Sequence, residues 1–136
     1  MTTNYAPSAF ERYAASVEED MAFVKDLLGK MLADNPEQLV RQLRECEAWY
    51  AWLNVCLADA NSFLDVAEAA SLVAKDKSVT DLDRAAIQSA AVANQRGFRN
   101  QVEGMAKALD TRLMLGMAVI KHFDNERRGL GAKTGS

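Results

Sequence analysis

The stretch LVRQLRECEAWYAWLNVCLADANSFLDVAEAASLVA, Leu39–Ala74, decides the fold of this 136-residue chain. It holds no proline and no glycine, and its apolar residues recur at alternating spacings of four and three, which is typical of one face of an α-helix. Two interleaved series, each with a period of seven, make up this face: Leu39, Cys46, Leu53, Ala60, Ala67 and Ala74, with Leu43, Tyr50, Leu57, Leu64 and Ser71. We therefore predict one helix over residues 36–76, about 60 Å long at 1.5 Å per residue.

Capping signals divide the rest of the chain into two further helices. Ser8-Ala9-Phe10-Glu11 is a capping box, and the apolar stripe that follows predicts a first helix over residues 8–33. Asn35-Pro36 is an N-cap followed by a proline suited to the first helical position, so the second helix begins there. Thr80 with Asp83 resembles another capping box, which predicts a third helix over residues 81–126 and a loose tail over 129–136.

These elements indicate an all-α protein whose two long helices form an antiparallel hairpin, with the first helix added to it. The turn of the hairpin is predicted at Lys77–Thr80. Residues 113–120, LMLGMAVI, are apolar on every helical face, which is unexpected for a helix exposed to water. We therefore predict an oligomeric helical bundle with a self-association surface on the third helix. The candidate interface residues are Leu113, Leu115, Met117, Ile120 and Phe123.

Composition narrows the class of protein further. The net charge is −3 and 49% of the residues are hydrophobic, which is typical of an ordered globular protein. The N-terminus shows no secretion signal, and residues 113–120, the longest apolar run, are too short to span a bilayer. Cys46 and Cys56 lie ten residues apart on one predicted helix, about 15 Å, so we expect free thiols and a cytoplasmic location.

Residues that could support catalysis are sparse. The single histidine, His122, has Val at position 119, so not even one Glu-x-x-His motif of a di-iron bundle is present. The chain also lacks a Cys-x-x-Cys motif, a phosphate-binding loop and a His-Glu-x-x-His motif. We therefore expect no enzymatic activity, no cofactor and no metal.

Trp49, Tyr50 and Trp52 gather on the second predicted helix, and two interpretations of this cluster remain open. In the first, the rings pack protein against protein, either on the first helix or on another subunit. In the second, the tryptophans stack on unpaired nucleic-acid bases, which contributes about 1–3 kcal/mol for each base. Base stacking is usually accompanied by interleaved cations, whereas the neighbours here are Glu45 and Glu47. Packing is therefore the favoured prediction.

Basic residues are unevenly distributed along the chain. Residues 1–77 hold seven Lys or Arg and thirteen Asp or Glu, whereas residues 78–136 hold nine and six. The C-terminal part can therefore present a basic surface to nucleic acid or to an acidic partner. The candidate DNA-binding residues are Lys75, Lys77, Arg96, Arg99, Lys121, Arg127 and Arg128. Solvated faces and local ion pairs are the alternative explanation for each of them.

With these features in place, the chain resembles the UvsY-type recombination mediators of tailed phages. The matching pieces are Tyr50-Ala51-Trp52-Leu53-Asn54 and Gly116 through Ile120-Lys121-His122, and the order of features covers roughly residues 45–128. The basic DNA-binding segment of that family follows the tryptophan by about twenty residues, which corresponds to Lys75 and Lys77 here. Asp76 interrupts the positive charge at this point.

The resemblance implies a non-enzymatic protein that forms ring-like homo-oligomers and binds single-stranded DNA. Its implied protein partners are a single-strand-binding protein, which it destabilises on the DNA, and a RecA-like recombinase, which it helps to load. The alternative is a small helical adaptor or inhibitor, for example a phage anti-defence protein, that binds another protein and no DNA.

Overall fold

The computed structural model describes residues 8–74 and 82–134, and the side chains of residues 8–70 and 89–129. Across these residues the protein is all-helical, and no strand occurs in them. Three helices follow one another along the chain: α1 (Ala9–Leu28), α2 (Pro36–Ala74) and α3 (Leu82–Thr134). The prediction of an all-α protein with three helices is therefore confirmed. The predicted turn at Lys77–Thr80 lies outside the described residues.

The predicted N-caps of the first two helices are observed in the structure. The Ser8 hydroxyl accepts from the backbone N–H of Glu11 at 3.1 Å, and the Asn35 side chain accepts from Glu37 N–H at 2.9 Å. Each bond satisfies a backbone donor that has no partner inside its helix. The two helices then begin at Ala9 and Pro36.

α1 ends at Leu28, five residues before the predicted end at residue 33. Gly29 lowers helix stability at this point, and the backbone beyond it finds other partners. The Gln42 side chain of α2 accepts from Ala33 N–H at 2.8 Å and donates to the Met31 carbonyl at 3.3 Å. Met31, which lies inside the predicted helix, is consequently outside the observed one and 89% exposed.

α3 continues through residues 129–134, where the sequence predicted a loose tail. No proline occurs in this part of the chain, and a helical glycine costs only about 1 kcal/mol relative to alanine. At 53 residues, α3 is about 80 Å long, against about 60 Å for the 39 residues of α2.

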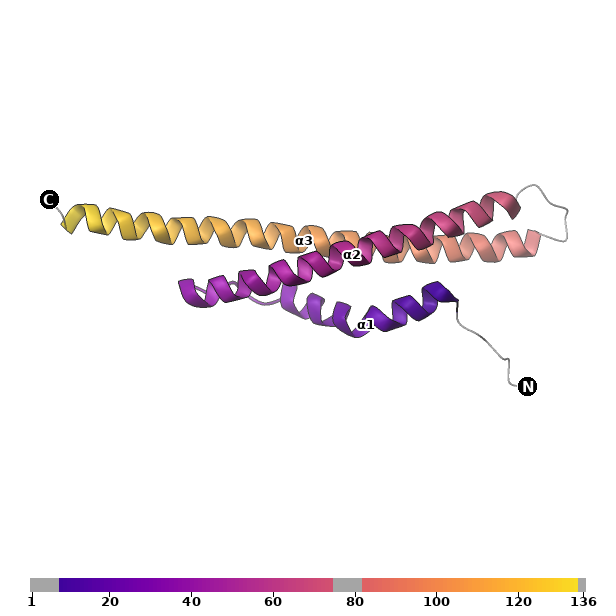
Figure 1. Cartoon of the computed structure of the whole chain (residues 1–136), viewed down its shortest axis with the longest axis horizontal. Helices are drawn as coiled ribbons and strands as arrows, with labels where there is room; N and C mark the ends of the chain where they lie inside the picture. The colour runs from indigo at the N-terminus through magenta and orange to yellow at the C-terminus, as the bar shows by residue number, and fades with distance from the viewer. Residues whose placement is uncertain (1–7, 75–81, 135–136) are drawn as a thin grey trace.

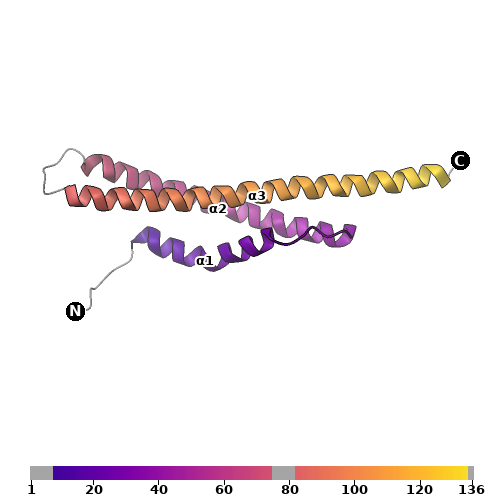
Figure 2. The same ribbon diagram turned by 180° about the vertical axis from the view of Figure 1, so that it is seen from behind.

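α2 and α3 lie side by side and run in opposite directions, as the views from both sides agree (Figures 1 and 2). Leu43 of α2 is so close to Gly116 of α3 that a Cβ at position 116 would collide with its side chain. Pro36 begins α2 seven residues before Leu43, so α2 accompanies α3 only to about Phe123. Beyond this point α3 extends alone, and residues 124–129 are all exposed.

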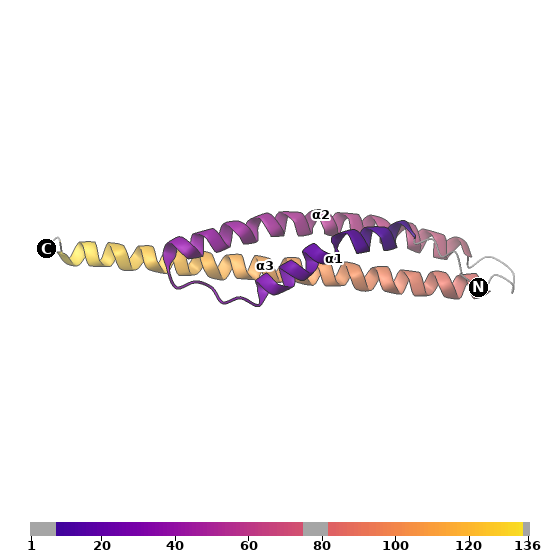
Figure 3. The same ribbon diagram turned by 90° about the horizontal axis from the view of Figure 1, so that it is seen from below.

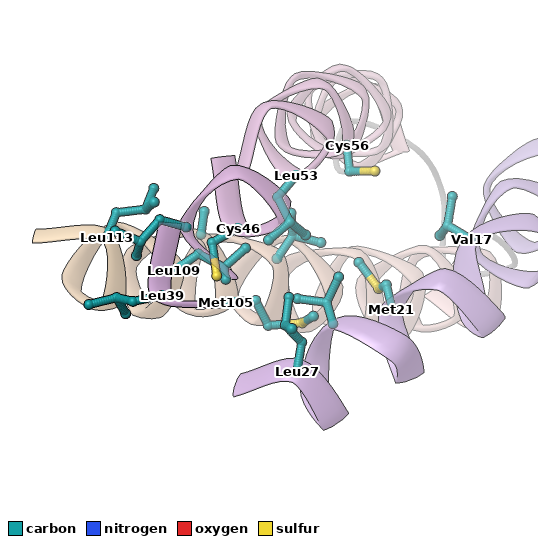
Figure 4. Packing of buried hydrophobic residues seen from close by; sticks show 14 residues of the cluster. Val17, Met21, Leu27, Leu39, Cys46, Leu53, Cys56, Met105, Leu109 and Leu113 are labelled. Atoms are coloured by element: carbon teal, nitrogen blue, oxygen red, sulfur yellow. The ribbon is translucent and has the colours of Figure 1, made fainter. Parts of the chain in front are cut away.

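α1 lies along one side of the α2–α3 pair, as the view in Figure 3 shows. The core forms where the apolar stripes of the three helices meet, and Figure 4 shows Met21 and Leu27 of α1 turned toward α3. The buried residues of this cluster are Val17, Met21, Val24, Leu27, Leu39, Leu43, Cys46, Leu53, Cys56, Val102, Met105, Ala106, Leu109 and Leu113. α1 therefore packs against the two long helices over only part of their length.

Candidate nucleic-acid and assembly interface

The basic residues in the middle of α3 are paired with carboxylates. Arg96 Nη2 lies 3.2 Å from Glu68 Oε1 of α2, and Arg99 Nη1 lies 2.7 Å from Glu103 Oε2. Lys107 Nζ contacts the other Glu103 oxygen at 2.9 Å. Lys107 and Arg99 lower the pKa of Glu103 by hydrogen bonding, so this carboxylate stays charged beside them. These cations already have counter-charges within the chain.

The basic residues at the C-terminal end of α3 differ from those in the middle in their lack of ion pairs with described residues. Lys121, Arg127 and Arg128 are exposed, and none of them forms an ion pair with a residue that the structure describes. His122 and Glu126 form the nearby i,i+4 contact at 3.1 Å. Asp124 and Glu126 reduce the local excess of positive charge. The segment therefore offers three cations that are available to phosphates.

Two further cations lie near the same end of the α2–α3 pair. Arg41 and Arg44 are exposed on the first turns of α2, beside the C-terminal half of α3 (Figure 1). Lys75 and Lys77, to which the family resemblance points, lie outside the described residues. Lys121, Arg127 and Arg128 are neighbours in sequence near the C-terminal end of α3, and Arg96 and Arg99 lie elsewhere along the same helix.

The residues predicted to form an oligomer interface divide into two groups. Leu113 is only 9% exposed and belongs to the core of its own chain, while Ile120 and Phe123 are half-buried against that core. Leu115 and Met117 are more than half exposed. The segment that the sequence showed as apolar on every face thus uses one face inside the chain and leaves another to solvent.

Met114, which the sequence prediction did not include, is 65% exposed beside Leu115 and Met117. It belongs to the same apolar run, so the signal was present, but only the structure shows which residues α2 leaves uncovered. Together Met114, Leu115 and Met117 form an exposed apolar surface next to Lys121.

The aromatic cluster lies between α1 and α2. Trp49 and Trp52 meet edge to face, with ring centroids 5.3 Å apart, and Trp49 also lies 5.2 Å from Phe23 of α1. Both tryptophans and Tyr50 are half-buried against the core. Phe23 of α1 thus contacts Trp49, as expected if the cluster packs protein against protein.

The two thiols are buried in the same region. Cys46 is fully buried and Cys56 is 2% exposed, and both are free. Burial raises the pKa of each thiol, so both remain protonated at neutral pH. The guanidinium of Arg112 lies near Cys46, and its Nε and Nη2 atoms are buried with no hydrogen-bond partner in the described part of the chain.

A groove of about 500 Å³ runs between α1 and α3, with Ala14, Ala15 and Ala22 on one side and Phe98 and Gln101 on the other. Most of the described residues that line it are apolar, and Glu18 and Lys25 are the charged ones among them. No group of three or more His, Cys, Asp or Glu side chains suited to a metal occurs among the described residues. A search of the same residues for a helix able to cross a membrane also finds none.

Comparisons with known proteins give no further guide, because no protein-family model, characterised protein or solved structure matches this chain.

Proposed function

We propose that this protein is a non-enzymatic, self-associating protein that binds single-stranded DNA and acts as a recombination mediator. In this proposal it forms an oligomeric helical hairpin, destabilises a single-strand-binding protein on DNA and assists the loading of a RecA-like recombinase. The observation that carries the proposal is the composition of the C-terminal segment of α3, defined as residues 114–129. It holds three exposed, unpaired cations next to an exposed apolar surface within the described part of the chain.

The cations of this segment suit a phosphate backbone rather than a defined base sequence. Lys121, Arg127 and Arg128 form no ion pair with a described residue, so phosphates would replace mainly water and salt ions around them. Arg96 and Arg99 would first have to give up Glu68 and Glu103. We therefore assign DNA binding chiefly to the C-terminal segment, with a smaller contribution from Arg41 and Arg44.

Self-association would compensate for the modest charge of a single subunit. Three cations in the C-terminal segment face two carboxylates, and the whole chain has a net charge of −3. Several copies on one DNA strand would act as tethered sites at a high effective concentration, which raises the overall affinity. The exposed Met114, Leu115 and Met117 supply apolar surface for such an assembly.

A fluorescence anisotropy titration of purified protein with labelled oligo-dT, at 50 mM and 200 mM salt, tests the proposal. We expect binding that weakens by about 0.7 log units per log unit of salt for each phosphate contact. Binding should depend little on base sequence. No binding at 50 mM salt would overturn DNA binding as the function.

A helical adaptor that binds another protein is the second candidate. It is favoured by the same exposed apolar surface, since Met114 and Met117 would pack equally well against a partner protein. The titration separates the two candidates, because an adaptor of this kind does not bind oligo-dT.

A further inference from the structure

A line of uncharged residues runs along the solvent face of α3. We call it the neutral stripe, and it follows the alternating three- and four-residue spacing of one helix face. Its members are all exposed: Asn94, Gly97, Gln101, Gly104, Ala108, Thr111, Leu115, Ala118, His122 and Asn125. None of them is Asp, Glu, Lys or Arg, whereas charged residues make up 26% of the chain and normally occupy such faces.

Two glycines in the neutral stripe have open space around them in the described part of the chain. A Cβ built on Gly97 or on Gly104 would meet nothing within 4 Å, whereas one on Gly116 would collide with Leu43. Glycine weakens a helix interior more than any residue except proline. Gly116 is explained by the close approach of α2, but the space over Gly97 and Gly104 is open. Glycines in a helix often allow the close approach of another backbone, and no described segment of this chain approaches Gly97 or Gly104.

We propose that the neutral stripe is the contact between two copies of this chain, with their α3 helices antiparallel about a two-fold axis between Ala108 and Thr111. This register sets Leu115 of the second copy over Gly104, and Ala118 of the second copy over Gln101. It likewise sets His122 over Gly97. Four of the five kinds of layer combine a larger residue with a smaller one, the fifth pairs Asn94 with Asn125, and the two-fold axis repeats every layer. The spacing is that of antiparallel heptads, in which side chains of one helix fill spaces on the other.

Charges beside the neutral stripe are compatible with this pairing. On the side of the neutral stripe that faces away from α1, Lys121 faces Asn100 of the second copy. Glu103 of the second copy follows Asn100 by one helical turn. Lys107 faces Met114 of the second copy. The register therefore brings no like charges together along this flank, and it covers the exposed Met114 and Leu115.

The size of the contact suits a weak dimer. Residues 94–125 extend about 47 Å along the helix, and a helix is about 10 Å wide. The stripe thus covers roughly 900–1,000 Å² over two copies, close to the lower limit of about 1,000 Å² for a specific interface. The groove between α1 and α3 adjoins Gln101 and adds apolar surface at one edge. We expect a dissociation constant in the micromolar range.

The pairing also gives the solitary end of α3 a neighbour. Residues 124–129, which α2 no longer accompanies in their own chain, would lie along residues 90–95 of the second copy. A helical segment without tertiary contacts is only marginally stable in water, so this support favours the observed extension of α3. The inference rests on the self-association in the proposed function, and it does not depend on DNA binding.

Sedimentation equilibrium of wild-type protein, Gly104→Leu and Leu115→Ala, with circular dichroism as the check on folding, tests the register. Because the space over Gly104 is open, Gly104→Leu should leave the monomer folded and weaken dimerisation at least tenfold. Ala58→Leu, at an exposed position on α2, is the control and should dimerise like wild type. The double variant Gly104→Leu/Leu115→Ala exchanges the large and the small residue and should recover much of the lost affinity.

The outcomes separate this inference from the proposed function. Wild-type protein that remains monomeric at 100 µM would overturn self-association and the neutral-stripe contact together. Wild-type protein that associates while folded Gly104→Leu associates equally well would overturn only the neutral-stripe contact. A double variant no better than Gly104→Leu alone would contradict the assigned register.

Discussion

The middle of α3 and its C-terminal segment belong to one continuous helix, yet they meet their surroundings in different ways. In the middle, Leu109 is fully buried and Arg96 is paired with Glu68 of α2. In the C-terminal segment, Leu115 is 57% exposed, and Arg127 forms no ion pair with a described residue. These side chains of the middle region therefore have partners among the described residues, whereas the similar side chains of the C-terminal segment lack them.

The two regions should differ most in how far a Leu→Ala substitution lowers the free energy of unfolding. Leu109→Ala should lower the free energy of unfolding by about 2–5 kcal/mol, because it leaves a cavity between the helices. Leu115→Ala should change it by no more than about 0.5 kcal/mol, because this side chain is exposed. Urea unfolding at low micromolar concentration measures both. Equal losses would mean that Leu115 is buried in the monomer and would remove the distinction.

Replacing a glycine with alanine should change the stability of the protein in opposite directions in the two regions. Gly116→Ala should destabilise the protein by about 1–3 kcal/mol, because the new Cβ collides with Leu43. Gly104→Ala should stabilise the monomer by about 1 kcal/mol, because alanine favours the helix and the space is open. Thermal unfolding of both variants under identical conditions provides the comparison. A destabilised Gly104→Ala monomer would show that this space is occupied within the chain.

The paired arginine in the middle of α3 should contribute only slightly to stability. The Arg96–Glu68 pair is about half exposed at both ends, so its loss in Arg96→Ala should cost about 0.2–1 kcal/mol. Glu68→Ala should cost a similar amount, and the double variant should cost less than the sum of the two. A double-mutant cycle followed by urea unfolding measures the coupling. Strict additivity would mean that the pair makes no net contribution.

The smallest effect concerns pH and the buried thiols of the core. Burial raises the pKa of Cys46 and Cys56, whereas both have an ordinary pKa of about 8.5 in the unfolded chain. The unfolded state therefore loses these protons first as the pH rises. Stability should be unaffected by the thiols below about pH 8 and should fall progressively above it. Replacing both cysteines with alanine should reduce this alkaline slope in urea unfolding, and an unchanged slope would assign it to other groups.

The sequence predicted the helices well because their signals are local. The Ser8 and Asn35 caps and the heptad pattern through Leu39 and Leu53 depend on residues a few positions apart, and both caps and the buried face are observed. The end of α1 was placed too late, because the side chain of Gln42 binds the backbone at Met31 and Ala33 from the next helix.

The candidate site was less predictable because it depends on which faces the other helices cover. Leu113 and Leu115 are indistinguishable in an apolar run, but α2 buries the first and leaves the second exposed. Arg96 and Arg127 are equally basic in sequence, and only the structure shows that Glu68 lies beside the first. The absence of charge along the neutral stripe was visible in the sequence, but its exposure was not.

DNA affinity, compared between variants of the two regions, tests the central claim most directly. The triple variant Lys121→Ala/Arg127→Ala/Arg128→Ala removes the unpaired cations, and Arg96→Ala/Arg99→Ala removes the paired ones. In anisotropy titrations with oligo-dT, we predict that the triple variant binds much more weakly. Its salt slope should be lower by about 2, from three contacts of about 0.7 each. The double variant should bind nearly as wild type does. Wild-type affinity and slope in the triple variant, with binding lost in the double variant, would contradict the assignment of DNA binding to the C-terminal segment.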